Sequence, residues 1–283
     1  MKSMKIMLPA LLLSLSLGAF AQDDDELLDA TSADEAPEVF VAAHPWEKPI
    51  FHRIQLGYIG TRAKYTNSNP AETILGNESY FLSGLSLTWL TDIVLSKKCP
   101  LYIGIGASFN YQTGRYNGSK VKNASLSYDW NSRVQGFYMT IPISISYQFR
   151  DVFTKGLTLA PYAGVYGRFN FVASRRQEKT TYFYNAVTGE VVDSETSTET
   201  KTLMKAKLEG GWPTAKPHAG KLFQAGVQVG VNAFYQRYSF GLAYMHDLIP
   251  FASHISPDTV DGTNCDMKIS TRHNIAINFG YFF

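Results

Sequence analysis

Apolar and polar residues alternate along eight separate runs of this chain. The alternation is clearest in the third run, where one face would carry Ile103, Ile105, Ala107, Phe109 and Tyr111 and the other Gly104, Gly106, Ser108, Asn110 and Gln112. Because successive side chains of a strand point to opposite faces, each run predicts a strand with one apolar and one polar face. The predicted strands span residues 52–61, 80–91, 101–112, 137–149, 157–171, 222–233, 237–245 and 268–283.

The polar faces consist mainly of Gly, Ser, Thr, Asn and Gln. The second to sixth predicted strands contain one charged residue, Arg168. A sheet face in water usually carries Lys and Glu, whereas small polar residues suit a narrow, crowded interior. The pattern therefore favours a barrel with its apolar face outward in lipid over a soluble barrel with its apolar face inward.

The connections between the predicted strands alternate in length. Those at 62–79, 113–136, 172–221 and 246–267 are long, and those at 92–100, 150–156 and 234–236 are short. Outer-membrane barrels have short periplasmic turns, long external loops and both termini in the periplasm. Residues 50–283 are therefore predicted to form an all-β, eight-stranded antiparallel up-and-down transmembrane β-barrel in a bacterial outer membrane.

The last run ends at the final residue, Phe283. Its predicted apolar face carries Ile269, Thr271, His273, Ile275, Ile277, Phe279, Tyr281 and Phe283. This run resembles the terminal strand of bacterial outer-membrane barrels, whose final Phe is bound by the assembly machinery. The resemblance implies two partners, the barrel-assembly machinery through Phe283 and the lipid of the outer membrane.

Two further segments carry a family resemblance. Residues 139–149 (MTIPISISYQF) and 156–171 (GLTLAPYAGVYGRFNF) resemble the small outer-membrane β-barrel family of the Bacteroidota that PorT typifies. The resemblance implies an eight-stranded barrel without a shared catalytic motif, and PorT itself belongs to a protein-secretion system. Pro142 and Pro161 fall inside these strands, where a proline removes a ladder hydrogen bond and normally indicates a bulge or an edge.

The first 49 residues have a different composition. Residues 1–21 contain Lys2, Lys5, an apolar stretch at 6–17 and the small-residue site Ala19-Phe20-Ala21, which predicts a secretory signal peptide. Residues 22–49 form an acidic arm, with eight acids and no Lys or Arg between 22 and 46. We expect a disordered or marginally helical periplasmic arm, and a docking segment for a chaperone or envelope partner is the alternative.

Four arginines are candidate interior residues. The face assignment points Arg53, Arg168, Arg237 and Arg272 inward, and the predicted strands contain no Asp or Glu to pair with them. Unpaired buried charge is costly, so these arginines would contact an anion or a carboxylate from a loop or the acidic arm. The favoured alternative is that all four lie near strand ends, where their long side chains reach water or lipid phosphate.

The remaining candidate chemistry is sparse. His254-Ile255-Ser256 resembles the His-Ser pair of lipid A deacylases, which leaves a lipid-modifying enzyme as a disfavoured alternative. The other histidines are dispersed, so we expect no metal and no cofactor. Cys99 and Cys265 fall on opposite sides of the predicted membrane, too far apart for a disulfide.

The third long loop has a pattern of its own. Residues 181–193 predict a hairpin with its turn near Thr188-Gly189, preceded by Tyr182, Phe183 and Tyr184. The hairpin would be either a plain extension of two strands or a recognition surface. The whole pattern predicts a non-enzymatic outer-membrane barrel that displays long loops and has no nucleic-acid partner. A component of a secretion or envelope-assembly complex is the first alternative.

Overall fold

The computed structural model describes residues 48–67, 79–95, 99–209, 212–215, 220–255 and 267–283. The chain divides into two compact units, Met1–Val41 and Ala42–Phe283, and every described residue belongs to the second. The predicted signal peptide and all but the last two residues of the acidic arm lie outside the described residues. Within the described part, no helix is long and apolar enough to cross a membrane.

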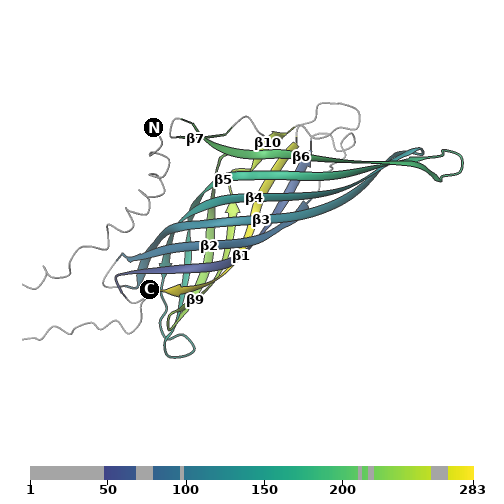
Figure 1. Cartoon of the computed structure of the whole chain (residues 1–283). Helices are drawn as coiled ribbons and strands as arrows, with labels where there is room; N and C mark the ends of the chain where they lie inside the picture. Colours follow the sequence, from purple (N-terminus) through teal and green to yellow (C-terminus); the bar gives the residue numbers. More distant parts are fainter. Residues whose placement is uncertain (1–47, 68–78, 96–98, 210–211, 216–219, 256–266) are drawn as a thin grey trace, which may run out of the picture. The chain divides into compact units, whose positions relative to one another are not determined.

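The described part of the chain is built from eleven β-strands (Figure 1). Their bounds are β1 Ile50–Asn67, β2 Ser79–Val94, β3 Leu101–Asn123, β4 Leu126–Tyr147, β5 Leu157–Tyr184, β6 Val191–Glu209, β7 Trp212–Ala215, β8 Phe223–Tyr235, β9 Tyr238–Asp247, β10 Ala252–Ile255 and β11 Met267–Phe282. All strand pairings are antiparallel, which confirms the predicted all-β antiparallel class.

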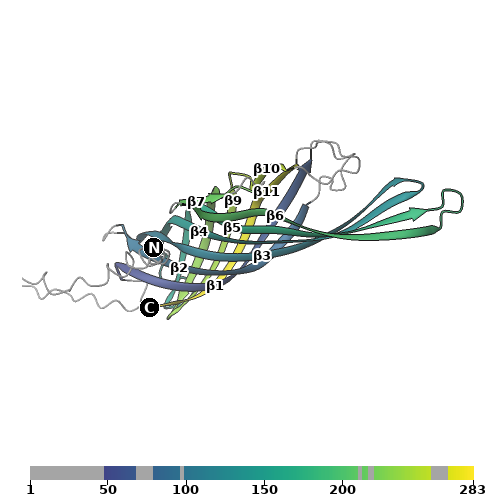
Figure 2. The ribbon, with the colours of Figure 1, turned by 45° about the horizontal axis from the view of Figure 1, so that its top comes forward.

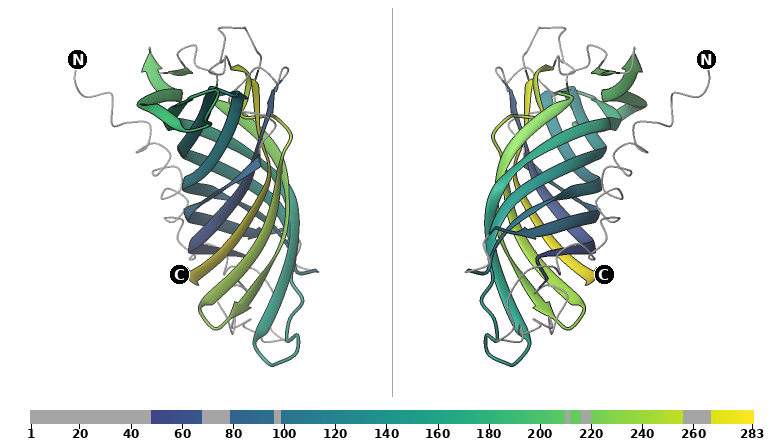
Figure 3. Two further views of the ribbon diagram at one scale, coloured as in Figure 1. Left: turned by 90° about the vertical axis from the view of Figure 1, so that its right-hand side faces the viewer. Right: turned by 90° about the vertical axis from the view of Figure 1, so that its left-hand side faces the viewer.

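Eight of these strands pair in sequence and return to the first. β1 pairs with β2, β2 with β3, β3 with β4, β4 with β5, β5 with β8, β8 with β9, β9 with β11 and β11 with β1 (Figure 3). We call this set the strand cycle. The other three strands lie outside it: β6 pairs with β5, β7 with β6 and β10 with β11. They come from segments that the sequence predicted to be loops.

The two prolines interrupt the hydrogen-bonded ladders without shifting their register. Between β3 and β4 the pairs Ile105↔Ile143 and Ser108↔Thr140 keep one register across Pro142. The β4–β5 ladder ends at the Ser146↔Tyr162 pair, next to Pro161, and resumes in register as an isolated bridge between Phe149 and Leu159. The missing proline N–H therefore produces a gap in the ladder rather than a bulge.

A register shift near one end of β11 changes which side chains face inward. β1 and β11 pair in register from Arg53↔Phe282 to Arg62↔His273, and the register shifts before Lys64↔Ser270. As a result Thr271 is buried, whereas Arg272 and His273 are both exposed. The predicted alternation holds from residue 273 to 283 and is wrong at Ile269, Thr271 and Arg272.

Aromatic clusters close the interior of the strand cycle at both ends. The floor cluster lies beside the short turns and consists of Phe51, Tyr102, Ala160, Phe234 and Phe282. The cap cluster lies at the opposite end and consists of Ala63, Tyr80, Tyr116, Tyr128, Trp130, Val134, Ala173, Leu203, Phe251 and Ile269. Between them the buried side chains are mostly Ser, Thr, Asn and Gln. The interior is therefore filled, with a polar middle layer between two aromatic ones.

Four strands continue beyond the strand cycle as an open sheet (Figures 1 and 2). Residues 114–123 of β3 pair with β4, residues 126–136 of β4 pair with β5, and residues 172–184 of β5 pair with β6. We call this sheet the extension. The prediction that residues 113–136 form a loop is wrong. The alternation of β4 continues to its outer end, where Tyr128, Trp130 and Val134 are the buried, inward-facing residues.

The predicted hairpin at 181–193 is confirmed at the tip of the extension. Asn185 and Glu190 close the turn, with a hydrogen bond from Asn185 N to Glu190 O of 2.9 Å. The Asn185 Oδ1 accepts a hydrogen bond from Val187 N at 2.9 Å. Gly189 has a φ of 73°, a left-handed conformation that glycine adopts without strain.

Candidate functional site

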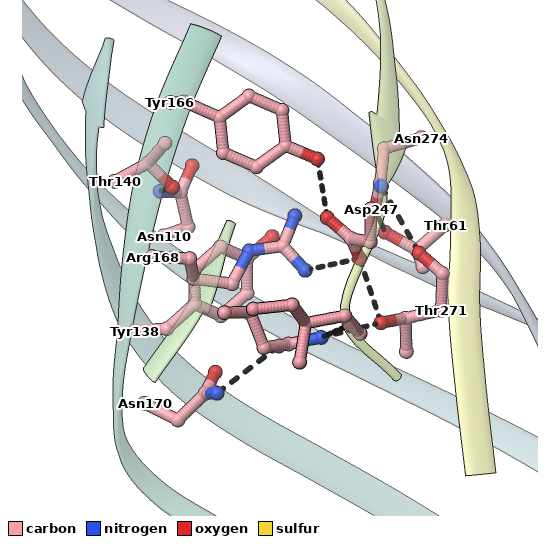
Figure 4. Close-up of polar contacts among 12 residues, drawn as sticks. Thr61, Asn110, Tyr138, Thr140, Tyr166, Arg168, Asn170, Asp247, Thr271 and Asn274 are labelled. Carbon is pink, nitrogen blue, oxygen red and sulfur yellow. Dashed lines mark hydrogen bonds and ion pairs between the residues drawn. The ribbon is translucent and has the colours of Figure 1, made fainter. Parts of the chain in front are cut away.

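A buried ion pair lies at the centre of the interior. Arg168 on β5 donates from Nη1 to Oδ2 of Asp247, the last residue of β9, over 2.7 Å. Their side chains are 3% and 0% exposed. Asp247 also accepts hydrogen bonds from Tyr166 Oη and, at 2.7 Å, from Thr271 Oγ1 (Figure 4). Three strands of the cycle, β5, β9 and β11, are thus joined through one carboxylate.

The guanidinium of Arg168 is held between two tyrosine rings. Its Cζ lies 4.6 Å from the ring centroid of Tyr138 and 5.6 Å from that of Tyr166. A desolvated cation over an aromatic face is stabilised by about 2 kcal/mol. The Nε and Nη2 atoms are buried and have no hydrogen-bond partner within the described part of the chain. The rings and Asp247 therefore hold the charge, and two of its donors remain unsatisfied.

Amides and hydroxyls continue this network around the interior. Gln112 accepts from Tyr138 Oη at 3.0 Å and donates from Nε2 to Thr61 Oγ1 at 2.8 Å, and Thr61 donates to Asn274 Oδ1 at 2.5 Å. On the other side, Asn170 donates to Gln224 Oε1 at 3.0 Å. Figure 4 shows Tyr138 and Asn170 on one side of this network and Thr61 and Asn274 on the other.

A second ion pair lies above the floor cluster. Arg53 on β1 donates from Nε to Oδ2 of Asp92 on β2 over 3.0 Å, and both side chains are 4% exposed. The Arg53 Cζ lies 5.4 Å from the ring centroid of Phe234. Phe51, Phe234 and Phe282 pack with ring centroids 5.1 to 6.2 Å apart. The rings cover the end of the interior directly below this pair.

Two small cavities accompany the ion pairs. One of about 70 Å³ is lined by Arg53, Asp92 and a group of hydroxyl and amide side chains that includes Ser86, Asn110 and Thr140. The other, of about 50 Å³, lies between Arg168 and the cap cluster. Each has room for a few waters, since one needs about 10–15 Å³ of such space. In the part of the chain that the structure describes, no three His, Cys, Asp or Glu side chains gather as a metal site would require.

The four predicted interior arginines divide into two groups. Arg53 and Arg168 are buried, each with an aspartate, so the expectation that no strand carboxylate is available to them is wrong. Arg237 is exposed in the turn between β8 and β9, where its Nη1 donates to Tyr281 Oη at 3.1 Å. Arg272 is exposed because of the register shift in β11. The expectation that these two point inward is therefore wrong.

The predicted recognition aromatics lie at the outer end of β5. Phe183 is 39% exposed, whereas Tyr182 and Tyr184 are half-buried. Tyr184 Oη lies 2.9 Å from Ser127 Oγ, which ties it to β4. Recognition by these three residues stays a prediction.

The other candidate positions are mostly outside the described residues. This holds for the side chain of His254 and for all of Ser256 and Cys265, so the predicted His-Ser pair and the predicted absence of a disulfide stay expectations. Cys99 is described and has a free thiol. Phe283 is 57% exposed and stacks on His52, with ring centroids 6.0 Å apart.

No protein-family model and no curated protein matches the chain. Among solved structures it is similar to Ail, the attachment invasion locus protein of Yersinia pestis, with 9% identity over 83% of this chain and 100% of that one and a TM-score of 0.30. It is also similar to Neisserial surface protein A, with 13% identity over 82% and 97% of the two chains and a TM-score of 0.30. A third similar structure is the outer membrane protein OprG of Pseudomonas aeruginosa, with 11% identity over 83% of this chain and 97% of that one and a TM-score of 0.36. Similarity at this level does not assign the chain to a family.

Proposed function

We propose that this chain is a bacterial outer-membrane protein in which the strand cycle forms a closed, eight-stranded barrel across the membrane. The outward faces of its strands carry this proposal, because each exposes an aliphatic side chain to its surroundings. These residues are Leu56, Leu87, Ile105, Ile143, Val165, Val229, Leu242 and Ile277, which are 41–61% exposed. Lipid favours such a continuous apolar surface, and water opposes it by about 25 cal/mol per Å².

Aromatic side chains border this aliphatic band at both ends. Beside the short turns are Tyr147, Phe149, Tyr235, Tyr238, Tyr281 and Phe283. Toward the extension are Tyr58, Phe81, Tyr111, Phe137 and Phe223. Membrane barrels concentrate aromatics at the two lipid–water interfaces, so the two groups support a membrane between them.

The short turns and the chain end are at the same side of the strand cycle. Arg53, near the start of β1, pairs with Phe282, and Phe283 N donates to His52 O at 3.3 Å. In an outer-membrane barrel this side faces the periplasm. The extension then lies outside the cell, on the surface side of the membrane.

The proposed role of the barrel is structural and interactive, without transport or catalysis. The filled interior supports this role, since among the described residues the floor and cap clusters close its two ends and the cavities beside the ion pairs measure about 70 and 50 Å³. The extension supplies the surface for interaction, because its strands are stiffened by pairing and their outer ends are exposed. An envelope complex would use the same surface, and stoichiometric co-purification of another protein would favour that alternative.

The membrane placement is tested by inserting the same charge at two exposed apolar positions. Leu87→Arg places a cation in the aliphatic band, and Val187→Arg places it at the tip of the extension, where the side chain is 93% exposed. We expect Leu87→Arg to lower the free energy of unfolding by about 2–4 kcal/mol and Val187→Arg to leave it within about 0.5 kcal/mol. Heat-modifiable mobility of the outer-membrane fraction gives the folded population.

Equal tolerance of the two arginines would refute the membrane placement, because water accepts a cation at either position. Recovery of the wild-type chain in the soluble fraction, with no mobility shift on boiling, would refute it as well.

A further inference from the structure

The extension ends in two open edges. On one side, residues 114–123 of β3 pair with β4 and with no other described strand, since β2 pairs with β3 only as far as Thr113. On the other side, residues 191–202 of β6 pair with β5 and with no other described strand. We call these the β3 edge and the β6 edge. An open edge presents backbone N–H and C=O groups in a row and is a template for pairing with another strand.

Both edges carry exposed residues. Every residue of β6 from Val191 to Thr200 is exposed, and Val192 is 68% exposed. On the β3 edge, Arg115, Asn117 and Val121 are exposed, the last by 74%. The two edges bound one sheet on opposite sides (Figure 2), so one extension can pair with two neighbours at once.

The edges carry opposite charge. The β3 edge contains three basic residues and no acid, and the β6 edge contains three acids and one lysine. The basic residues are Arg115, Lys120 and Lys122, and the acids are Asp193, Glu195 and Glu199. Opposite charges facing each other across two strands contribute about 0.2–1 kcal/mol per pair, and like charges destabilise. Each edge is therefore complementary to the other edge and repels its own kind.

We propose that neighbouring copies of this chain join side by side, with the β3 edge of one copy pairing with the β6 edge of the next. The inference rests on the proposed function, because one membrane gives every copy the same orientation. In each copy β3 and β5 run from the short turns toward the tip, and β4 and β6 run back. A β6 edge beside the next copy's β3 edge is therefore antiparallel and continues the alternation of the sheet.

Pairing between like edges is disfavoured by the same geometry. Two β3 edges, or two β6 edges, from copies with the same orientation would run parallel and would bring like charges together. The contact is therefore heterologous, and it builds rows or rings of barrels instead of closed two-fold dimers.

The test uses energy transfer between copies labelled at the amino terminus, purified and reconstituted in phosphatidylcholine vesicles. Only this chain is present, so transfer reports self-association. One variant reverses the β6 edge, a second reverses the β3 edge, and a third combines both changes. The first carries Asp193→Lys, Glu195→Lys and Glu199→Lys, and the second carries Arg115→Glu, Lys120→Glu and Lys122→Glu.

We expect wild-type copies to associate and each single-edge variant to lose association at least about tenfold, because both of its edges then carry the same sign. A mixture of the two single-edge variants restores opposite charges between copies, as does the combined variant, so association returns in both. Wild-type barrels that stay apart would overturn the inference. Association that survives in both single-edge variants would overturn it too.

Heat-modifiable mobility of each sample separates this inference from the proposed function. A chain that does not fold into the membrane refutes the proposed function itself. A folded chain without edge-dependent association refutes only the pairing of copies.

Discussion

Removing the Asp247 carboxylate measures how much the interior network stabilises the strand cycle. The carboxylate accepts hydrogen bonds from Arg168, Tyr166 and Thr271, and its side chain is 0% exposed. Asp247→Ala removes the acceptor of all three hydrogen bonds at once and leaves the Arg168 cation buried. The two free donors of Arg168 already lack partners, so no second acceptor compensates within the described residues.

The expected loss follows from these contacts. Breaking a buried ion pair by removing one partner costs about 3–5 kcal/mol, because the remaining charge is uncompensated. Each of the two hydroxyls loses a hydrogen bond with a net value of about 1 kcal/mol, partly replaced by water in the neighbouring cavities. We expect Asp247→Ala to lower the free energy of unfolding by about 4–6 kcal/mol. Asp247→Asn keeps an acceptor oxygen but still leaves the Arg168 charge uncompensated, so it should cost about 3–5 kcal/mol.

The assay is urea unfolding of the refolded protein in detergent micelles, followed by heat-modifiable mobility. Arg237→Ala is the matched control, since Arg237 is exposed and makes one hydrogen bond to Tyr281. We expect the control to stay within about 1 kcal/mol of wild type. If Asp247→Ala loses no more than Arg237→Ala, the buried pair does not stabilise the fold and the reasoning is wrong.

A double variant separates the burial of charge from the loss of packing. Arg168→Met with Asp247→Leu removes both charges together and fills the space with apolar side chains. Buried ion pairs replaced in this way often leave stability unchanged or raise it. We expect this variant to recover most of the loss seen in Asp247→Ala. A loss as large as that of Asp247→Ala would show that the charges themselves are not the cause.

Two further predictions each compare a test residue with a control residue. Gly118→Ala should loosen the extension, because the added Cβ would lie 2.3 Å from Cζ2 of Trp130. We expect proteases to cut the extension of this variant while the barrel stays folded. Gly136→Ala is the control that should stay resistant, because its Cβ would lie 3.7 Å from the nearest atom. Phe282→Ala should lower the free energy of unfolding in urea by about 3–5 kcal/mol, because Phe282 is 1% exposed in the floor cluster. Phe283→Ala should change this free energy by no more than about 1 kcal/mol but should reduce assembly of the protein in cells. Equal effects within either pair would contradict the placement of these side chains.

The sequence predicted the membrane-facing strands well because their alternation is a local property. The inward residues Gln224, Gln228 and Asn232 of β8 are buried as expected, and the outward valines between them are exposed. What failed was the position of the strand ends. Two of the predicted strands ended at residues 91 and 245, and so excluded Asp92 and Asp247. Both aspartates continue the inward phase of their strands, and this phase was the signal that could have identified them.

Other features have no local signal. Asp247 lies 79 residues from Arg168, so only the pairing of β8 with β5 and β9 brings them together. The register shift that exposes Arg272 depends on the partner strand β1 and leaves no trace in the composition of β11. The extension lies between these cases, since Tyr128, Trp130 and Val134 do alternate with Asp129, Asn131 and Arg133. Charged outward residues concealed the pattern because a lipid-facing strand would not carry them.

The two ion pairs supply something that the amides and hydroxyls of the interior cannot. A slip of two residues between β8 and β9 would keep every side chain on its own face and would exchange one small or polar interior side chain for another at most positions, with little cost. The same slip would move Asp247 along the interior, about 7 Å away from Arg168. Both charges would then be buried without a partner, so the pair with Arg168 penalises the wrong register more than it stabilises the right one. We infer that charge is kept in this interior to specify register. The double variant decides this, because a stable barrel that refolds in a single register without the pair would exclude such a role.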